Sequence, residues 1–193
     1  MDVPPVGAPA EGAEGPASRV VLAPDDGSLG PLLRIADDRL GPGEGYGRHD
    51  HRAVDVVAVV LAGGLQHRWG RGADLAAGDV AVLRAGAGLT HDEVAGDRGA
   101  RVLQCYLRSA APAEPAAHAV HRSAAGWVDL GRPDTRLWVG HAEPGEEVVP
   151  PAGLVLVAGD DGVRPHDGGA VRTGGAATVL VWQLDAGRPS WAC

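Results

Sequence analysis

Four residues in two closely spaced pairs carry the strongest chemical signal in the chain. His49 and His51 form one pair and His91 and Glu93 the other, each with a single residue between its members. Successive side chains of a β-strand point to opposite faces, so residues two positions apart project to the same side. If the two strands lie side by side, three imidazoles and one carboxylate converge. First-row divalent metals accept such ligands and keep positions open for water or substrate, so the sequence predicts a mononuclear metal site.

The segments around these pairs read as short β-strands. Apolar runs rich in Val, Leu and Ile alternate with breaks of Gly, Pro and Asp, and no segment shows an apolar helical period of helical length. The runs are 19–23, 32–36, 54–62, 65–69, 79–84, 101–108, 137–141, 153–158 and 178–184. Many short strands without helices predict an all-β sandwich or barrel of jelly-roll type.

Composition divides the chain into four parts. Residues 1–18 are rich in Pro, Ala, Gly and Glu, and we expect a disordered tail because they hold few large apolar groups. Residues 19–109 carry the paired histidines, and residues 110–119 contain two prolines and predict a linker. Residues 120–193 repeat the strand rhythm without a His-x-His pair. We therefore predict two barrel-like halves packed together, because a partner half covers exposed sheet edges.

The charge and the cysteines exclude several classes of protein. The net charge of −8 and the pI near 5.4 argue against non-specific binding of nucleic acid. Cys105 and Cys193 are the only cysteines, so a disulfide framework is not expected. We see no signal peptide and no apolar run of membrane-spanning length, so we expect a cytoplasmic protein that does not contact a membrane.

Two motifs resemble those of a known family. The spacing of Gly43, His49, His51 and Asp55 is similar to the first motif of cupin barrels. The segment 85–93, Ala-Gly-Ala-Gly-Leu-Thr-His-Asp-Glu, resembles the second motif of pirins, a bicupin family that includes bacterial proteins of the quercetin 2,3-dioxygenase type. Segments 33–38 and 63–67 also look like pirin segments. The resemblance covers about 32–109, whereas the C-terminal half matches in strand rhythm alone.

The resemblance implies a fold and a ligand set. Pirins are all-β proteins made of two cupin (jelly-roll β-barrel) halves, and the N-terminal half binds the metal. Their two first-motif histidines, second-motif histidine and following glutamate bind one iron, and these correspond by position to His49, His51, His91 and Glu93. Fe(II) is therefore the expected cofactor, although the ligand types also admit Ni, Co, Cu, Mn or Zn.

The resemblance also implies a function. We expect a dioxygenase acting on a flavonol-like, quercetin-type enolic substrate, with a small aromatic substrate and dioxygen side by side at the metal. Glu93 would stay a ligand or take the hydroxyl proton as a general base. The alternative is a non-catalytic regulatory protein whose metal and redox state controls binding to a protein partner. A third possibility is a cupin isomerase or sugar-binding protein, for which Arg48, Arg52 and Arg84 would be the nearby basic residues.

Asp55 is a candidate neighbour of the metal ligands. It lies four positions after His51, which on an unbroken strand places both residues on one face. It could accept a hydrogen bond from a ligand imidazole or act as a fifth ligand. The alternative is a structural ion pair with Arg52 or Arg84.

Three other residues are candidates for the pocket. His67 could face the pocket and orient a ligand or substrate, or it could be exposed. Tyr46 and Trp69 could line an apolar pocket for an aromatic ligand, with core packing as the alternative for Trp69. The chain departs from the usual pirin residues at Asp50, Asp55, Trp69 and Gly70, which predicts an altered pocket lining.

The remaining candidates receive structural interpretations. Cys105 lies in an apolar run and is expected to be a buried, inert thiol. Four scattered histidines are expected to be solvated or locally hydrogen bonded: His118, His121, His141 and His166. Four tryptophans are expected in the core or between the halves: Trp127, Trp138, Trp182 and Trp191.

Overall fold

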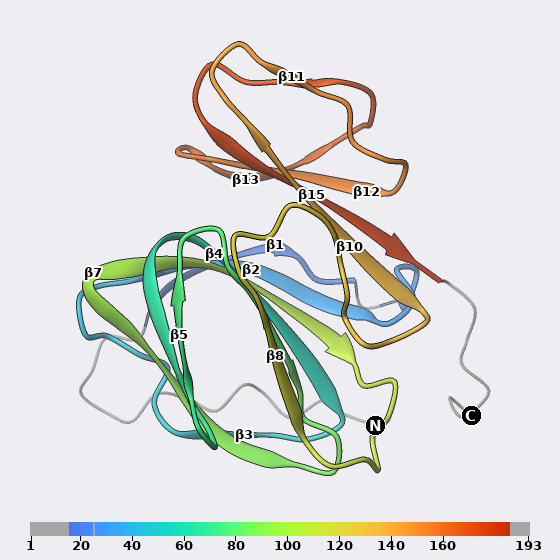
Figure 1. The fold of residues 1–193 in the computed structure, drawn as a ribbon. Coiled ribbons are helices and arrows are strands. Elements are labelled where there is room, and N and C mark those ends of the chain that lie inside the picture. The colour runs from blue at the N-terminus through green and yellow to red at the C-terminus, as the bar shows by residue number, and fades with distance from the viewer. Residues whose placement is uncertain (1–15, 25, 186–193) are drawn as a thin grey trace.

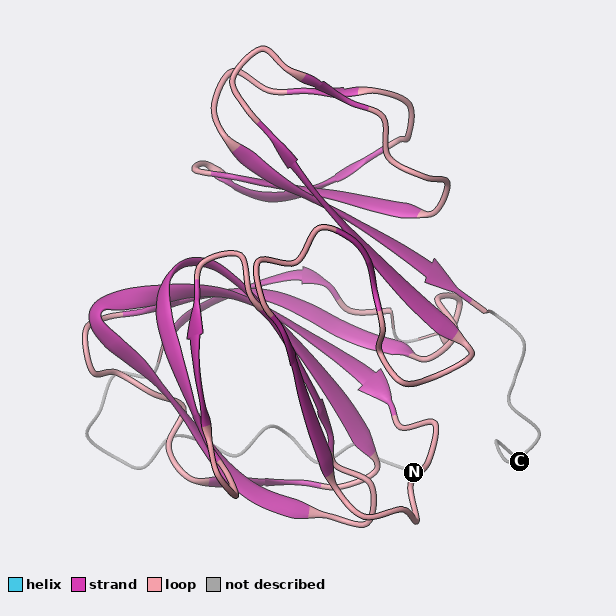
Figure 2. Ribbon diagram, viewed as in Figure 1, coloured by secondary structure: helices cyan, strands magenta, loops and turns pink. Residues whose placement is uncertain are grey.

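The fold consists of β-strands arranged in two lobes (Figures 1 and 2). The computed structural model describes residues 16–24 and 26–185 of the chain. Within these ranges there is no helix, and so none that could cross a membrane. The predicted tail falls mostly outside the described residues, but its last residues, 17 and 18, belong to the first strand. The expectation of an all-β chain with two barrel-like halves is confirmed.

The first half is a single bent sheet whose main strand order is β1-β2-β7-β4-β6-β8. In addition, β3 pairs with β7 and β5 pairs with β4, all antiparallel. The strands of this half are β1 (Ala17–Leu22), β2 (Leu32–Leu40), β3 (His49–His51), β4 (Val54–Arg68), β5 (Ala73–Ala76), β6 (Val80–Arg84), β7 (Leu89–Arg108) and β8 (Ala117–His121).

The second half is smaller and consists of two sheets. One has the order β13-β12-β15-β10-β9, and the other contains only β11 and β14. The strands are β9 (Gly126–Val128), β10 (Thr135–Ala142), β11 (Glu147–Val148), β12 (Leu154–Gly159), β13 (Gly162–His166), β14 (Val171–Arg172) and β15 (Ala177–Leu184). Figure 1 shows this half, in orange and red, above the β1–β2 side of the first.

The boundary between the halves follows from β8. Its residues 117–119 were predicted as the end of the linker, yet they pair with β6 in the first sheet. The first half therefore extends to His121, and the second sheet begins at Gly126. Proline content alone could not show that the chain rejoins the first sheet after residue 116.

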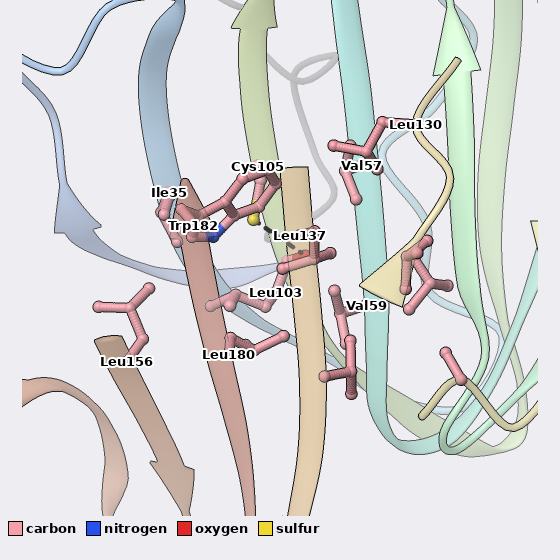
Figure 3. Close-up of a cluster of buried hydrophobic side chains, with 14 of the residues drawn as sticks. Ile35, Val57, Val59, Leu103, Cys105, Leu130, Leu137, Leu156, Leu180 and Trp182 are labelled. Carbon is pink, nitrogen blue, oxygen red and sulfur yellow. Dashed lines mark hydrogen bonds between the residues drawn. The ribbon is translucent and has the colours of Figure 1, made fainter. Parts of the chain in front are cut away.

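Alternation along the strands builds separate apolar layers. Val57 and Val59 of β4 pack towards the second half, whereas Ala58 and Val60 pack inside the first half. Figure 3 shows how residues of both halves, including Leu103, Leu137 and Trp182, meet in one buried cluster. A fully buried side chain of this size contributes about 1.5–3 kcal/mol relative to exposure, so this shared layer holds the halves together.

The core contains Cys105 and some of the tryptophans. Cys105 is a free thiol buried in the shared layer, as predicted. Trp182 is buried there and Trp138 packs against the core of the second half, but Trp127 is 42% exposed and lies under the guanidinium of Arg136. Trp127 sits on β9, which is an edge strand of its sheet, and this position accounts for the exposure. Trp191 lies outside the described residues.

Candidate metal centre

The short strand β3 brings the paired histidines together. It pairs with the start of β7, so that His49 lies opposite His91 and His51 lies opposite Leu89. Between these positions, Asp50 and Thr90 face the other side, where the Thr90 hydroxyl donates a hydrogen bond of 2.5 Å to the Asp50 carboxylate. Strand alternation therefore aims three imidazoles at one point and uses the intervening polar pair to fasten β3.

The three imidazoles meet through their Nε2 atoms. Nε2 of His49 lies 3.0 Å from Nε2 of His51 and 3.0 Å from Nε2 of His91. Their ring centroids are 4.5–4.9 Å apart. Within the described part of the chain, these three residues are the only group of metal-ligating side chains whose ligand atoms all lie this close together.

Hydrogen bonding and burial prepare these nitrogens for a cation. The carbonyl of Gly47 accepts a hydrogen bond of 2.7 Å from Nδ1 of His49, so Nε2 of this ring carries the lone pair. The lone pair on Nε2 of His49 can accept only one hydrogen bond, yet the Nε2 atoms of His51 and His91 both lie next to it. A metal ion, in contrast, can bind the lone pairs of all three Nε2 atoms. Burial, reinforced by neighbouring imidazoles, lowers the pKa of His51 to about 4 and that of His91 to about 3. Both rings are therefore neutral at pH 7, as metal binding requires.

Glu93 lies beside this group but has its own partners. One carboxylate oxygen accepts a hydrogen bond of 2.9 Å from Nε2 of Gln104, and the other is in ion-pair contact with Nε2 of His67. Burial alone would raise the pKa of Glu93, but His67 and the nearby His91 outweigh it and lower the pKa, which keeps the carboxylate ionised. A buried carboxylate therefore borders the three imidazoles, held from two sides.

His67 is held in turn by a residue from the end of the first half. Its Nδ1 lies 3.1 Å from Nε2 of His118 on β8, and the two rings stack with centroids 5.1 Å apart. The expectation that His118 is solvated or locally bonded is therefore wrong, because β8 returns to the sheet and brings it to His67. His67 itself is 4% exposed, so of its two predicted positions the exposed one does not occur.

Sequence reasoning missed Gln104, which lies in an apolar run with no motif around it. Its only sequence signal is its place on β7, where it alternates with buried Leu103 and Cys105 and so faces the interior. An uncharged amide at an inward position of a core strand needs a buried partner, and that partner is Glu93.

Asp55 lies away from the histidines. Its carboxylate accepts a hydrogen bond of 2.8 Å from the guanidinium of Arg132, and both side chains are almost completely buried. Arg84, one of its predicted partners, instead donates to the carbonyl of Gly131. Asp55 thus joins the two halves and touches no ligand imidazole. The prediction that Asp55 shares a face with His51 required an unbroken strand. Strand β3 ends at His51, and residues 52–53 separate it from β4, so that requirement is not met.

Aromatic side chains border the site on two sides. The ring of Tyr46 lies 6.4 Å from that of His49, and its hydroxyl donates to Asp38. Tyr106 lies 6.0 Å from His51 and packs, together with Trp69, against an apolar cluster that includes Leu89. These side chains provide apolar surface next to the imidazoles, on which an aromatic ring could rest.

An open groove of about 740 Å³ lies at the turn between β4 and β5. His67 lines it from β4, Trp69 from the turn that follows β4, and Thr90 from β7. Its other walls include Arg48, which directly precedes His49, and the polar turn residues around Arg71. The groove therefore begins at residues that adjoin the histidine group.

Comparisons with known proteins identify the family of the first half. Residues 24–107 match the sequence profile of the Pirin family. The quercetin 2,3-dioxygenase of Escherichia coli is 33% identical over 64 residues, which cover 32% of this chain and 28% of that protein. The chain thus matches less than a third of the length of this curated relative. The resemblance to pirins read from the two motifs is confirmed.

Solved structures show the fold over most of the chain. A quercetin 2,3-dioxygenase from Acinetobacter baumannii has a TM-score of 0.65 at 18% identity, over 91% of this chain and 83% of that one. The bacterial pirin YhhW of Escherichia coli, in complex with nickel(II), has a TM-score of 0.61 at 19% identity, over 87% and 91%. The fold is therefore that of two cupin halves packed together, as predicted.

Proposed function

Since residues 24–107 form a pirin domain, we propose that the protein binds one divalent metal ion at His49, His51 and His91, with Glu93 as a further ligand or as the adjacent base. The observation that carries this proposal is that Nε2 of His49 lies 3.0 Å from Nε2 of His51 and 3.0 Å from Nε2 of His91. Neutral imidazoles and a carboxylate suit Fe(II), which we propose first, and they suit nickel, the ion in the YhhW complex, almost as well.

We further propose that this site is a dioxygenase centre for an enolic, flavonol-like substrate. Two of the proteins compared above carry the name quercetin 2,3-dioxygenase. A bound divalent ion would act as a Lewis acid that favours the ionised form of an enolic hydroxyl. The apolar surface around Trp69 and Tyr106 would hold the ring system and keep water from it.

The protein's own groups provide the acid–base chemistry. Glu93 is ionised and buried, so it can take the hydroxyl proton of the substrate at a carboxylate oxygen. Gln104 and His67 hold that carboxylate in place, and His118 holds His67. A proton accepted by Glu93 would therefore stay next to two imidazoles in a chain of hydrogen-bonding groups that ends at half-buried His118.

The test combines metal analysis with an activity assay. Purified protein is reconstituted anaerobically with iron or nickel, its metal content is measured, and oxygen uptake is followed with quercetin. His51→Ala should lose both the metal and the uptake, whereas the control His166→Ala, on β13 of the second half, should keep both. One metal per chain without uptake would reject the dioxygenase and leave the regulatory alternative. No bound metal would reject the whole proposal.

A further inference from the structure

The groove beside the metal centre concentrates positive charge in an acidic protein. Three arginines line it, Arg48, Arg68 and Arg71, whereas Asp74 is its only acidic residue. The chain as a whole has a net charge of −8. Three guanidinium groups around one open groove raise the local concentration of small anions, because the groove walls focus the field.

None of these arginines is in an ion pair with another described residue. Arg48 and Arg71 are exposed and make neither a hydrogen bond nor an ion pair with a described residue, and Arg68 donates only to the side chain of Gln66. Asp92 lies opposite Arg68 in the strand register, yet these two residues do not form an ion pair. Arginine offers a planar fork that matches a carboxylate, so unpaired guanidinium groups in a groove are suited to bind one.

The turn between β4 and β5 holds Arg71 at the groove. Trp69 and Gly72 close this turn with a backbone hydrogen bond of 2.8 Å, and Gly70 has a φ of 58° at its first central position. Positive φ at that position is typical of tight hairpin turns, and glycine adopts it without the steric cost of a Cβ atom. His67 lies on the strand that precedes the turn, and Trp69 follows directly after the end of that strand. One hairpin therefore presents a cation, an aromatic ring and a neighbour of Glu93 to the same groove.

We propose that the substrate of this site is an anionic enol, in which the enolic oxygen faces the histidine group and a carboxylate lies in the groove against Arg68 and Arg71. This inference rests on the proposed metal function for the enolic end. The arginines of the groove would bind the carboxylate at the other end of the substrate, so the groove favours an acid over an uncharged flavonol.

The test uses two probes that differ by one charged group. Pyromeconic acid is an uncharged hydroxypyranone that chelates metals through its enol, and comenic acid is the same ring with one added carboxylate. Dissociation constants are measured by calorimetry with zinc-loaded protein, in which no turnover occurs. We expect comenic acid to bind about tenfold more tightly than pyromeconic acid, and the preference to shrink as salt rises from about 0.02 M to about 0.5 M.

Arginine variants locate the effect. Arg71→Gln and Arg68→Gln should each reduce the preference for comenic acid by about three- to fivefold while leaving pyromeconic acid unchanged. Arg98→Gln is the matched control, because Arg98 is also exposed but lies on β7 outside the groove lining. Equal binding of the two probes by the wild type would overturn the proposal.

A metal-free experiment separates this proposal from the metal function. Isophthalate, a small aromatic dicarboxylate, is titrated into metal-free protein while the indole N–H resonance of Trp69 is followed, with uncharged isophthalamide as the control. A shift caused by isophthalate alone, weakened in Arg71→Gln, supports the groove even if no metal binds and the proposed function fails. Without such a shift the groove is not an anion site, even if pyromeconic acid reports a working metal centre.

Discussion

At the residue scale, the proposed function gives Glu93 a part in both metal binding and proton transfer. We predict that Glu93→Gln weakens metal affinity by about ten- to hundredfold and abolishes oxygen uptake, because it removes the one buried negative charge beside three imidazoles. Affinity is measured by competition with a metal indicator. The control is Asp97→Asn, an exposed acid on the same strand. Unchanged affinity together with unchanged turnover would show that Glu93 is neither ligand nor base.

His118 makes the stability of the metal-free protein depend on pH. Burial lowers its pKa to about 4, below the ordinary value of 6.5, so the unfolded chain takes up this proton first as the pH falls. The contribution of His118 to the free energy of unfolding is therefore complete above about pH 6.5 and is lost between about pH 6.5 and pH 4. The slope of the unfolding free energy against pH is proportional to the number of protons taken up on unfolding. We predict that His118→Gln lowers this number by up to about one in this window. Urea unfolding of both proteins measures the slopes, and equal slopes would contradict the prediction.

The histidine triad and its supports differ in how far the sequence predicts them. His49 and His51 could be placed on one face because β alternation depends only on spacing along the chain. Their meeting with His91 also needed the assumption that the two strands are neighbours, which they are in the β3–β7 pairing. Gln104 and His118 could not, since their partners depend on which strands are neighbours. The return of β8 to β6, in particular, is not visible in local residue patterns.

At the element scale, bends in β4 and β7 place the site. The β4–β7 register shifts between Val60 and Ala62 and again between Gly63 and Leu65. Gly63 has a φ of 71°, and a Cβ atom there would overlap the carbonyl oxygen of Gly99 on β7. The two strands can therefore turn together only because no side chain separates their backbones.

We predict that Gly63→Ala lowers the free energy of unfolding by about 2–4 kcal/mol, since it adds both a strained φ and a clash with backbone. Gly96→Ala is the matched control in the same bend, because its added Cβ would meet its nearest atom at an ordinary 3.7 Å. Denaturant unfolding at neutral pH measures both variants. A cost for Gly63→Ala no larger than that for Gly96→Ala would show that the bend tolerates a side chain.

These bends also explain where element predictions were incomplete. The apolar runs 54–62 and 65–69 were read as two strands, but they form one bent strand, because glycines at a bulge break the apolar pattern without ending the ladder. The run 101–108 is only the second part of β7. In its first part, the positions that face inward hold polar site residues such as His91 and Glu93 in place of apolar ones. A strand without inward apolar residues looks like a loop in the sequence unless its histidines are recognised as ligands.

At the scale of the whole molecule, the halves share one buried layer and a few buried polar links. Arg101 of β7 binds the Asp37 carboxylate through two hydrogen bonds of 2.8 Å, and it also donates to the carbonyl of Gly159 in the second half. The sheet of the first half therefore has two buried faces: one packs against the second half, and the other faces the interior of the first half. Loss of the second half would expose the apolar face of the first, so we regard it as a structural partner of the site.

The Asp55–Arg132 pair is the most completely buried of these links, and it gives the final prediction. Arg132→Leu leaves the Asp55 carboxylate without its cation in an apolar setting, so we expect a loss of about 3–5 kcal/mol in the free energy of unfolding. Burial already raises the pKa of Asp55 against the effect of Arg132, and without the arginine the pKa rises further. The folded state then holds a proton that the unfolded chain has released, so the loss should be larger at pH 8 than at pH 5.

Two further variants make this prediction decisive. Arg172→Leu removes an arginine from an exposed ion pair with Glu147 and should cost no more than about 1 kcal/mol at either pH. The double variant Asp55→Asn with Arg132→Leu should be more stable at pH 8 than Arg132→Leu alone, because the unpaired charge is gone while the shape is nearly kept. Urea unfolding at the two pH values measures all four proteins. A double variant that is no more stable than the single one would mean that Arg132 acts by packing and by its bonds to Asp134 rather than by neutralising Asp55.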